Sequence, residues 1–97
     1  MIPHVPAEVV EAATRDSWRA LFADVPTRQW DLVLQMNPEF IAVHRRHVHA
    51  LLAFNGDVVK SVLAVTGQPF GTMFDGTKNF QRKLAAYLGE WNVRHGR

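Results

Sequence analysis

The sequence contains no cysteine, which excludes disulfide bonds and metal sites that are held by thiolates. Its apolar runs are much shorter than the ~20 residues that a transmembrane helix needs, and no segment combines a strongly basic helix face with exposed Trp and Phe. The N-terminal segment lacks the charged and apolar regions of a secretory signal. These absences predict a cytoplasmic protein that neither crosses nor binds a membrane.

Signatures of catalysis are also missing. The sequence has no G-x-S-x-G elbow, no glycine-rich phosphate loop, no H-E-x-x-H zinc motif and no cysteine nucleophile. Its carboxylates show no spacing typical of acid–base catalysis, and 97 residues leave little room for a deep substrate pocket. We therefore expect a protein that is not an enzyme and that carries no cofactor and no metal.

What is present is the composition of a folded domain. Hydrophobic residues make up 47% of the chain and three residues are Trp, which is enough to form a core. The length corresponds to one domain, residues 1–97. Apolar residues recur at helical spacing between breaks formed by Pro, Gly and Asn. We therefore predict an all-α fold, a compact bundle of about five helices.

Start and stop signals give the expected boundaries of these helices. Two prolines make residues 1–6 an extended lead-in. The expected helices span 7–23, a short segment from Thr27 to the "MNPEF" break, 38–54, 58–66 and 77–94, with an irregular loop at 68–76.

The capping residues support these boundaries. Asn37 is a favourable N-cap before Pro38, and Asn55–Gly56 supplies the left-handed residue that ends the following helix. Asp57 and Gly67 can cap the two ends of the next segment. That segment is rich in β-branched Val and is compatible with a strand, but its caps favour a helix.

The same periodicity predicts which side chains face the core. The helices at 38–54 and 77–94 are the longest and most clearly amphipathic, so we place them at the centre of the bundle. The predicted core consists of Val10, Trp18, Leu21, Trp30, Val33, Phe40, Val43, Leu51, Phe54, Val62, Leu63, Phe80, Leu84, Leu88 and Trp91.

The stretch "HRRHVH", residues 44–49, places three of the five histidines beside two arginines. Successive residues of a helix are about 100° apart around its axis. His44 and His47 therefore lie on the apolar side of the predicted helix, whereas the two arginines and His49 lie on the opposite side. The six residues cannot all contact one ligand.

The two histidines on the apolar side have alternative interpretations. Imidazoles one helical turn apart can supply two ligands of a zinc or nickel site, with a third from His4, His95 or a carboxylate. Alternatively, His44 and His47 are neutral, hydrogen-bonded residues at the margin of the core, or take part in pH sensing. Because no third ligand is marked in the sequence, we predict no metal site.

Positive charge is concentrated in the second part of the chain. Residues 40–97 carry a net charge of +5, against −3 for residues 1–39. Since arginine binds phosphate oxygens well, we expect contact with a DNA or RNA backbone, as a subunit of a nucleoprotein complex or as a regulator. The alternative is a solvated face neutralised by the acidic half. The predicted contacts are Arg45, Arg46, His49, Lys78, Arg82 and Lys83.

A weaker pattern lies in "HALLAFNGDVVKSVLAVTGQPFGTMF", about a quarter of the chain. Asn55–Gly56 separates two predicted helices, and Gly67 ends the second of them with a turn. Gly71-Thr72-Met73 then matches the G-T-apolar start of a third helix. This order resembles a helix-turn-helix of the Fis type and implies DNA binding by the last helix of the motif. That helix is apolar here and is expected to stop at Asp75–Gly76, whereas reading base edges requires polar side chains.

The bulky residues of the same loop suggest a second class of function. If Phe70, Met73 and Phe74 point outward, they form an adaptable protein-binding surface; the alternative is that they pack into the core. The outward arrangement predicts a protein-interaction module, such as a small phage- or plasmid-encoded inhibitor of the anti-CRISPR kind, which acts by binding another protein. Both hypotheses leave homo-oligomerisation open.

Overall fold

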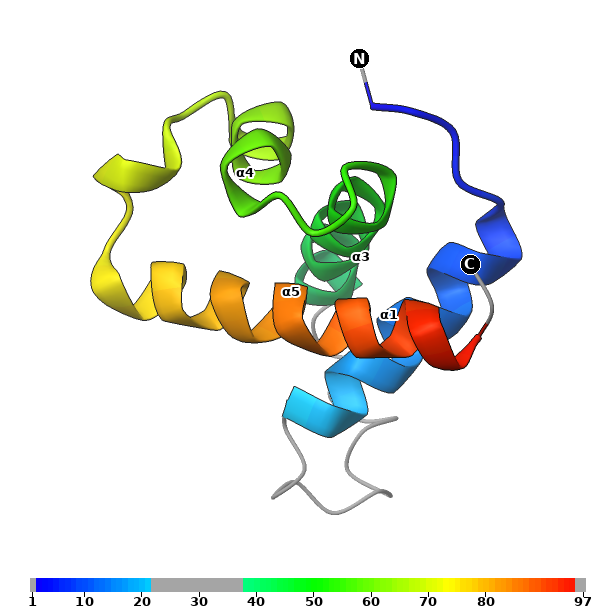
Figure 1. The fold of residues 1–97 in the computed structure, drawn as a ribbon. Coiled ribbons are helices and arrows are strands. Elements are labelled where there is room, and N and C mark those ends of the chain that lie inside the picture. The colour runs from blue at the N-terminus through cyan, green and yellow to red at the C-terminus, as the bar shows by residue number, and fades with distance from the viewer. Residues whose placement is uncertain (1, 22–37, 96–97) are drawn as a thin grey trace.

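The computed structural model describes residues 2–21 and 38–95, and every regular element within them is helical (Figure 1). The predicted all-α fold is therefore confirmed, with four α-helices in the described residues where about five were predicted for the chain. The predicted helix after Thr27 and the N-cap Asn37 lie outside the described residues. The helices are α1 (Ala7–Leu21), α3 (Pro38–Ala53), α4 (Val58–Thr66) and α5 (Asp75–Arg94), with a 3₁₀ turn, η1 (Phe70–Thr72).

The segment before α1 is extended, as the two prolines predict, and packs against the bundle. Val5 is buried, and the carbonyl of Pro6 accepts the first backbone hydrogen bonds of α1, at 3.1 Å from both Val9 N and Val10 N. Pro6 therefore precedes the helix, which leaves its missing N–H without consequence. None of the helices in the described ranges is long and apolar enough to span a bilayer.

The connection between α3 and α4 follows its sequence signals. Asn55 and Gly56 have φ values of 55° and 84°, the left-handed conformation that ends a helix. The Asp57 side chain accepts a hydrogen bond from the Lys60 backbone N–H at 3.1 Å, as expected of an N-cap. Gly67 ends α4 with φ 73°. The predicted caps of α4 are confirmed.

The segment predicted as an irregular loop is shorter than expected. Its centre forms η1, and α5 begins at Asp75 rather than near Thr77. Asp75 and Gly76 were expected to stop a helix, but they start one, because an acidic residue in the first turn suits the positive end of the helix dipole. The two residues between η1 and α5, Met73 and Phe74, have extended backbones.

Helix α3 lies at the centre of the described helices (Figure 1). It contacts α1, α4 and α5, and α1 also contacts α5. Buried side chains from the lead-in, α1, α3 and α5 meet in one hydrophobic cluster, which confirms α3 and α5 as central elements. The cluster consists of Val5, Val10, Ala13, Val48, Leu51, Leu52, Leu84, Leu88 and Trp91.

Three residues predicted for the core are exposed. Phe40 is 62% exposed, Val43 43% and Leu63 50%. Every buried side chain of α3 lies at His44 or beyond, so the first turn and a half of this helix projects past its neighbours. Helical periodicity predicts the direction of a side chain around the axis, but not where along the axis the packing ends.

The remaining core predictions are confirmed or partly confirmed. Val10, Leu51, Val62, Leu84, Leu88 and Trp91 are buried. Trp18, Leu21, Phe54 and Phe80 are half-buried, while Trp30 and Val33 lie outside the described residues. The sequence did not mark the small buried residues Ala13, Ser17, Ala50 and Ser61, which are 0% exposed. Small side chains let neighbouring helices approach closely, but they carry little hydropathy signal.

A matched pair of leucine variants tests this placement of the core. Leu51→Ala removes a fully buried side chain and should lower the free energy of unfolding by about 2–5 kcal/mol because it leaves a cavity. Leu63→Ala makes the same change on the exposed face of α4 and should cost no more than about 0.5 kcal/mol. Urea denaturation followed by circular dichroism measures both; equal losses of stability would contradict this packing.

Candidate nucleic-acid interface

His44 and His47 belong to the core and not to a binding surface. His44 is 5% exposed, and its Nε2 lies 2.9 Å from the Oγ of Ser17 on α1. The Ser17 hydroxyl also lies 3.1 Å from the Thr14 carbonyl; by donating there, it leaves its oxygen free to accept the Nε2–H of His44. The His44 ring packs edge-on against Trp18, at 5.3 Å between centroids. The histidine therefore bridges α1 and α3.

Burial sets the protonation of both histidines. It removes water from the charged imidazole and lowers the pKa of His44 to about 4, with His47 acting in the same direction. Burial also lowers the pKa of His47, assisted by the positive charge of Arg46. Both side chains are therefore neutral at pH 7 and add no positive charge to the surface.

A metal site at His44 and His47 would need a third ligand, and the described residues do not provide one. Within residues 2–21 and 38–95, no three His, Cys, Asp or Glu side chains lie close enough together to hold a metal ion. The nearest polar partner of His44 is a serine hydroxyl, which is not among the usual ligands of zinc.

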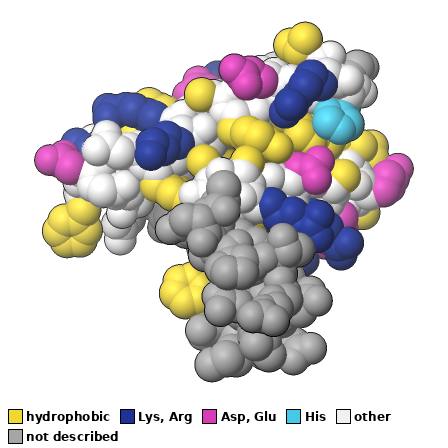
Figure 2. Space-filling view, turned by 90° about the horizontal axis from the view of Figure 1, so that it is seen from below, with side chains coloured by type: hydrophobic (Ala, Val, Ile, Leu, Met, Phe, Trp, Pro, Cys, Tyr) yellow, Lys and Arg dark blue, Asp and Glu magenta, His cyan; other side chains and the backbone are white. Residues whose placement is uncertain are grey.

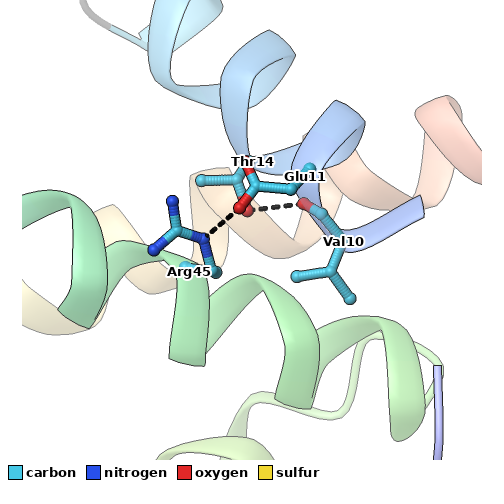
Figure 3. A network of polar contacts seen from close by, with 4 residues as sticks. All are labelled: Val10, Glu11, Thr14 and Arg45. Carbon is cyan, nitrogen blue, oxygen red and sulfur yellow. Dashed lines mark hydrogen bonds and ion pairs between the residues drawn. The ribbon is translucent and has the colours of Figure 1, made fainter. Parts of the chain in front are cut away.

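Arg45 was predicted to contact a ligand but is held by the protein itself. Its Nε lies 2.6 Å from Oε1 of Glu11 on α1, and Figure 3 shows the guanidinium reaching across from α3 to this carboxylate. The Nε has no partner in hydrogen-bond geometry, so the contact is an ion pair without a directed hydrogen bond. Acidic and basic parts of the chain neutralise each other at this point, the alternative that the charge distribution left open.

The other two predicted contacts on α3, Arg46 and His49, form a cluster with Arg45 in sequence but differ from each other. His49 is half-buried, and its Nε2 lies 3.3 Å from the Pro3 carbonyl in the lead-in. Arg46 is exposed and makes no ion pair with a described residue. The structure therefore leaves Arg46 as the free cation of this cluster.

The remaining predicted contacts lie on the first half of α5 and are Lys78, Arg82 and Lys83. Lys78 Nζ is 3.5 Å from Oδ1 of Asp75. The guanidinium of Arg82 lies over the Phe70 ring, 5.3 Å from its centroid, and donates a long hydrogen bond of 3.4 Å to Asn79. Lys83 is exposed, and neither it nor Arg82 pairs with a carboxylate of the described residues. The exposed parts of the Arg82 and Lys83 side chains can therefore contact an anion.

The cationic side chains do not form one continuous surface on the face seen in Figure 2. Lys and Arg side chains gather in separate groups, with hydrophobic and acidic side chains between them. One group lies at the left end, where Figure 1 places the N-terminal part of α5. We call Lys78, Arg82 and Lys83 the α5 cluster, and this cluster is the candidate interface.

The apolar loop divides between core and surface. Phe70 is buried and Met73 is half-buried, so the predicted outward arrangement is wrong for Phe70. The ring of Phe70 packs under Arg82 instead. Phe74, by contrast, is 86% exposed. Its carbonyl accepts the backbone N–H of Lys78 at 2.9 Å, which places it directly beside the α5 cluster.

The segment that resembles a Fis-type helix-turn-helix has a different shape after Gly67 from the one the motif implies. Gly71 and Thr72 lie in η1, and Met73 ends it. The long helix that follows starts at Asp75. The resemblance stays a prediction, and any base-reading role would fall to α5.

Sequence reasoning treated Phe74 and the α5 cluster as parts of two separate surfaces. Their closeness was visible, because Phe74 comes four residues before Lys78, and Lys78 four residues before Arg82. The last two share a helix face, and Phe74 is the N-cap of the same helix. The expected stop at Asp75–Gly76 hid this register by separating Phe74 from the helix.

The buried histidine predicts a stability that depends on pH. An unfolded histidine binds its proton near pH 6.5, whereas His44 in the folded protein resists protonation down to about pH 4. As pH falls below 6.5, the unfolded state therefore binds a proton at this histidine before the folded state does. The free energy of unfolding should decrease between about pH 6.5 and pH 4, by about 3 kcal/mol for this one group. Urea denaturation at pH 7, 6, 5 and 4.5 should show this fall in the free energy of unfolding.

Two variants separate this effect from general destabilisation. His44→Leu removes the titrating group and should show a shallower dependence on pH than the wild type. Leu51→Ala keeps His44 and should lower stability at every pH without changing the dependence. A His44→Leu variant whose pH dependence equals that of the wild type would contradict the assignment.

Comparisons with protein-family models, with curated proteins and with solved structures found no match. A function is therefore assigned from the contacts, burial and charge of the residues described above.

Proposed function

We propose that the protein is a non-catalytic module that binds a nucleic-acid backbone through the α5 cluster. The observation that supports this most is the state of Arg82 and Lys83. They are adjacent, exposed and without a carboxylate partner among the described residues, so they reach an anion without first breaking an ion pair. Arg46 on α3 is a third cation in the same state among the described residues.

The local charges of α5 support an anionic partner. The first nine residues of the helix carry three cations and one carboxylate, that of Asp75. Lys78 and Arg82 are four residues apart, and like charges at this spacing repel each other. Lys78 also lies in the first turn of the helix, where the helix dipole is positive. A phosphate backbone would relieve both unfavourable terms.

The ion pairs at this site set its expected strength. Arg82 and Lys83 can neutralise phosphates directly, whereas Lys78 must exchange its contact with Asp75 at 3.5 Å for one with the ligand. Arg45 is held by Glu11 and is left out of the interface. Because only a few phosphates are neutralised, we expect a low affinity that decreases as the salt concentration rises.

A second function is favoured by a different observation. Phe74 at 86% exposure and the exposed pair Val59 and Leu63 on α4 are apolar side chains in contact with water. Such residues are typical of surfaces that bind proteins. This would suit a small inhibitor that acts by binding another protein, and such a complex would tolerate salt.

Reversing the two free charges tests the proposed function. Arg82→Glu/Lys83→Glu should weaken binding to a labelled 20-nucleotide DNA at low salt at least tenfold. It should also reduce the slope of log K against log salt, by about 0.7 for each phosphate of a single strand that the variant no longer neutralises. Fluorescence anisotropy at 25, 50 and 100 mM salt measures both quantities.

The matched control places the same charge change elsewhere. Arg15 and Arg19 are exposed on α1, which meets α5 near its opposite end through the hydrogen bond from Trp91 to Asp16. Arg15→Glu/Arg19→Glu should therefore bind more tightly than the α5 variant. If the two double variants lose affinity equally, binding reflects net charge and the α5 cluster is not the interface.

A further inference from the structure

We infer that the α5 cluster binds single-stranded nucleic acid in preference to duplex, with Phe74 as the ring on which an unpaired base stacks. This inference rests on the proposed function and adds the class of ligand to it. It depends on Phe74 itself, because the cations of the α5 cluster would serve a single strand and a duplex alike.

Phe74 is a large aromatic side chain that the fold does not use. It is 86% exposed, although a phenylalanine gains free energy when it leaves water. Its backbone is nevertheless fixed: it has φ −61° and ψ 149°, and its carbonyl accepts the first-turn N–H of Lys78 at 2.9 Å. The ring therefore projects from a defined position, which lowers the entropy lost when a ligand stacks on it.

The position of Phe74 relative to the cations suits a nucleotide chain. Lys78 and Arg82 are four residues apart on α5, which corresponds to about 6 Å along the helix and about 40° around it. Phe74, four residues before Lys78, is the N-cap of this helix and has an extended backbone. An aromatic ring at the start of the helix thus precedes two cations that share one side of it. Proteins that bind single strands combine these same two elements, a stacking platform and a positive track for the backbone.

The neighbours of Phe74 favour stacking over the reading of base edges. Gly71 has no side chain, Phe70 is buried, and Met73 is apolar and half-buried. The one polar side chain between 70 and 74 is that of Thr72, and its hydroxyl donates to the Pro69 carbonyl at 2.7 Å. Because this single side-chain donor is used within the turn, we expect binding that depends little on base sequence.

Duplex does not satisfy the same arrangement. In a double helix the faces of the bases are covered by their neighbours, so a protein ring reaches them only where bases are unstacked or unpaired. Phe74 would then contribute nothing to duplex binding and would remain in water. A preference for single strands is the consequence, and it must disappear when the ring is removed.

The experiment compares fluorescein-labelled 20-nucleotide oligo-dT with a 20-base-pair duplex by anisotropy at 50 mM salt. The wild type should bind oligo-dT more tightly than duplex. Phe74→Ala should weaken binding to oligo-dT by about 5- to 100-fold, the range found for loss of one stacked base, and change duplex binding less than about twofold. Because the Phe74 side chain is exposed, the thermal melting temperature of the Phe74→Ala variant should match that of the wild type.

Two further variants test the ring as distinct from its apolar surface. Phe74→Leu keeps an apolar side chain without an aromatic face, and should lose affinity for oligo-dT nearly as much as Phe74→Ala. Phe74→Trp should keep or improve it. If Phe74→Leu binds oligo-dT like the wild type, stacking is excluded and the inference is wrong.

The outcomes also separate this inference from the proposed function. If Arg82→Glu/Lys83→Glu abolishes binding while Phe74→Ala has no effect, the backbone contact stands and the stacking inference is overturned. If Phe74→Ala weakens binding to oligo-dT and duplex equally, the inference is overturned as well. If the wild type binds neither ligand, the proposed function fails and the inference fails with it, which leaves Phe74 to a protein partner.

Discussion

The packing of α3 against α1, α4 and α5 is the constraint on which the rest of the structure depends. Buried alanines and Ser17 at its contacts allow close approach, and His44 spans the α1–α3 contact through its 2.9 Å hydrogen bond to Ser17. Once His44 points into the core, the next residue must point about 100° away from it. That direction brings Arg45 to Glu11 on α1. The position of His44 in the core therefore determines that Arg45 forms an ion pair within the protein.

The same packing explains why part of α5 is free to bind. All of its buried side chains lie at Gln81 or beyond, so the helix is anchored by its second part. Leu84, Leu88 and Trp91 hold that part in the core. The first five residues contribute no side chain to the core and form a projecting end, whereas the sixth, Phe80, is half-buried and packs against the core. Most residues on this projecting end are exposed, although the Lys78 side chain is only 22% exposed.

Local signals in the sequence predicted most of the fold. The caps of α4, the left-handed Asn55–Gly56 turn and the period of α5 depend on interactions within a few residues, and these predictions are confirmed. The predicted start of α5 was wrong by two residues because glycine more often ends a helix than begins one. A glycine in a first turn costs little when the preceding residues are already extended and an acidic side chain precedes it.

The candidate site was less predictable because it depends on distant pairs. Glu11 and Arg45 come from different helices, and their sequence separation gives no sign that they meet. Asp75 and Lys78 are three residues apart, a spacing at which side chains on a helix can contact each other. Their ion pair could be predicted only if α5 was known to start at Asp75. The exposure of Phe74 follows from where packing ends along an axis, a property of the assembled helices that periodicity does not contain.

The separation between the anchored and projecting parts of α5 has an energetic consequence. Changes at Phe74 or Lys83 remove no buried surface, so they alter binding while the core is kept. A change at Arg82 also removes the guanidinium that packs over the buried Phe70 ring. The low pKa of His44, in contrast, links pH to the stability of the core, which α5 joins through Phe80 and the buried residues from Gln81 onward. Effects at sites without shared partners are usually additive. Ligand binding at the projecting end and proton binding in the core should therefore be nearly independent above the pH at which the fold is lost.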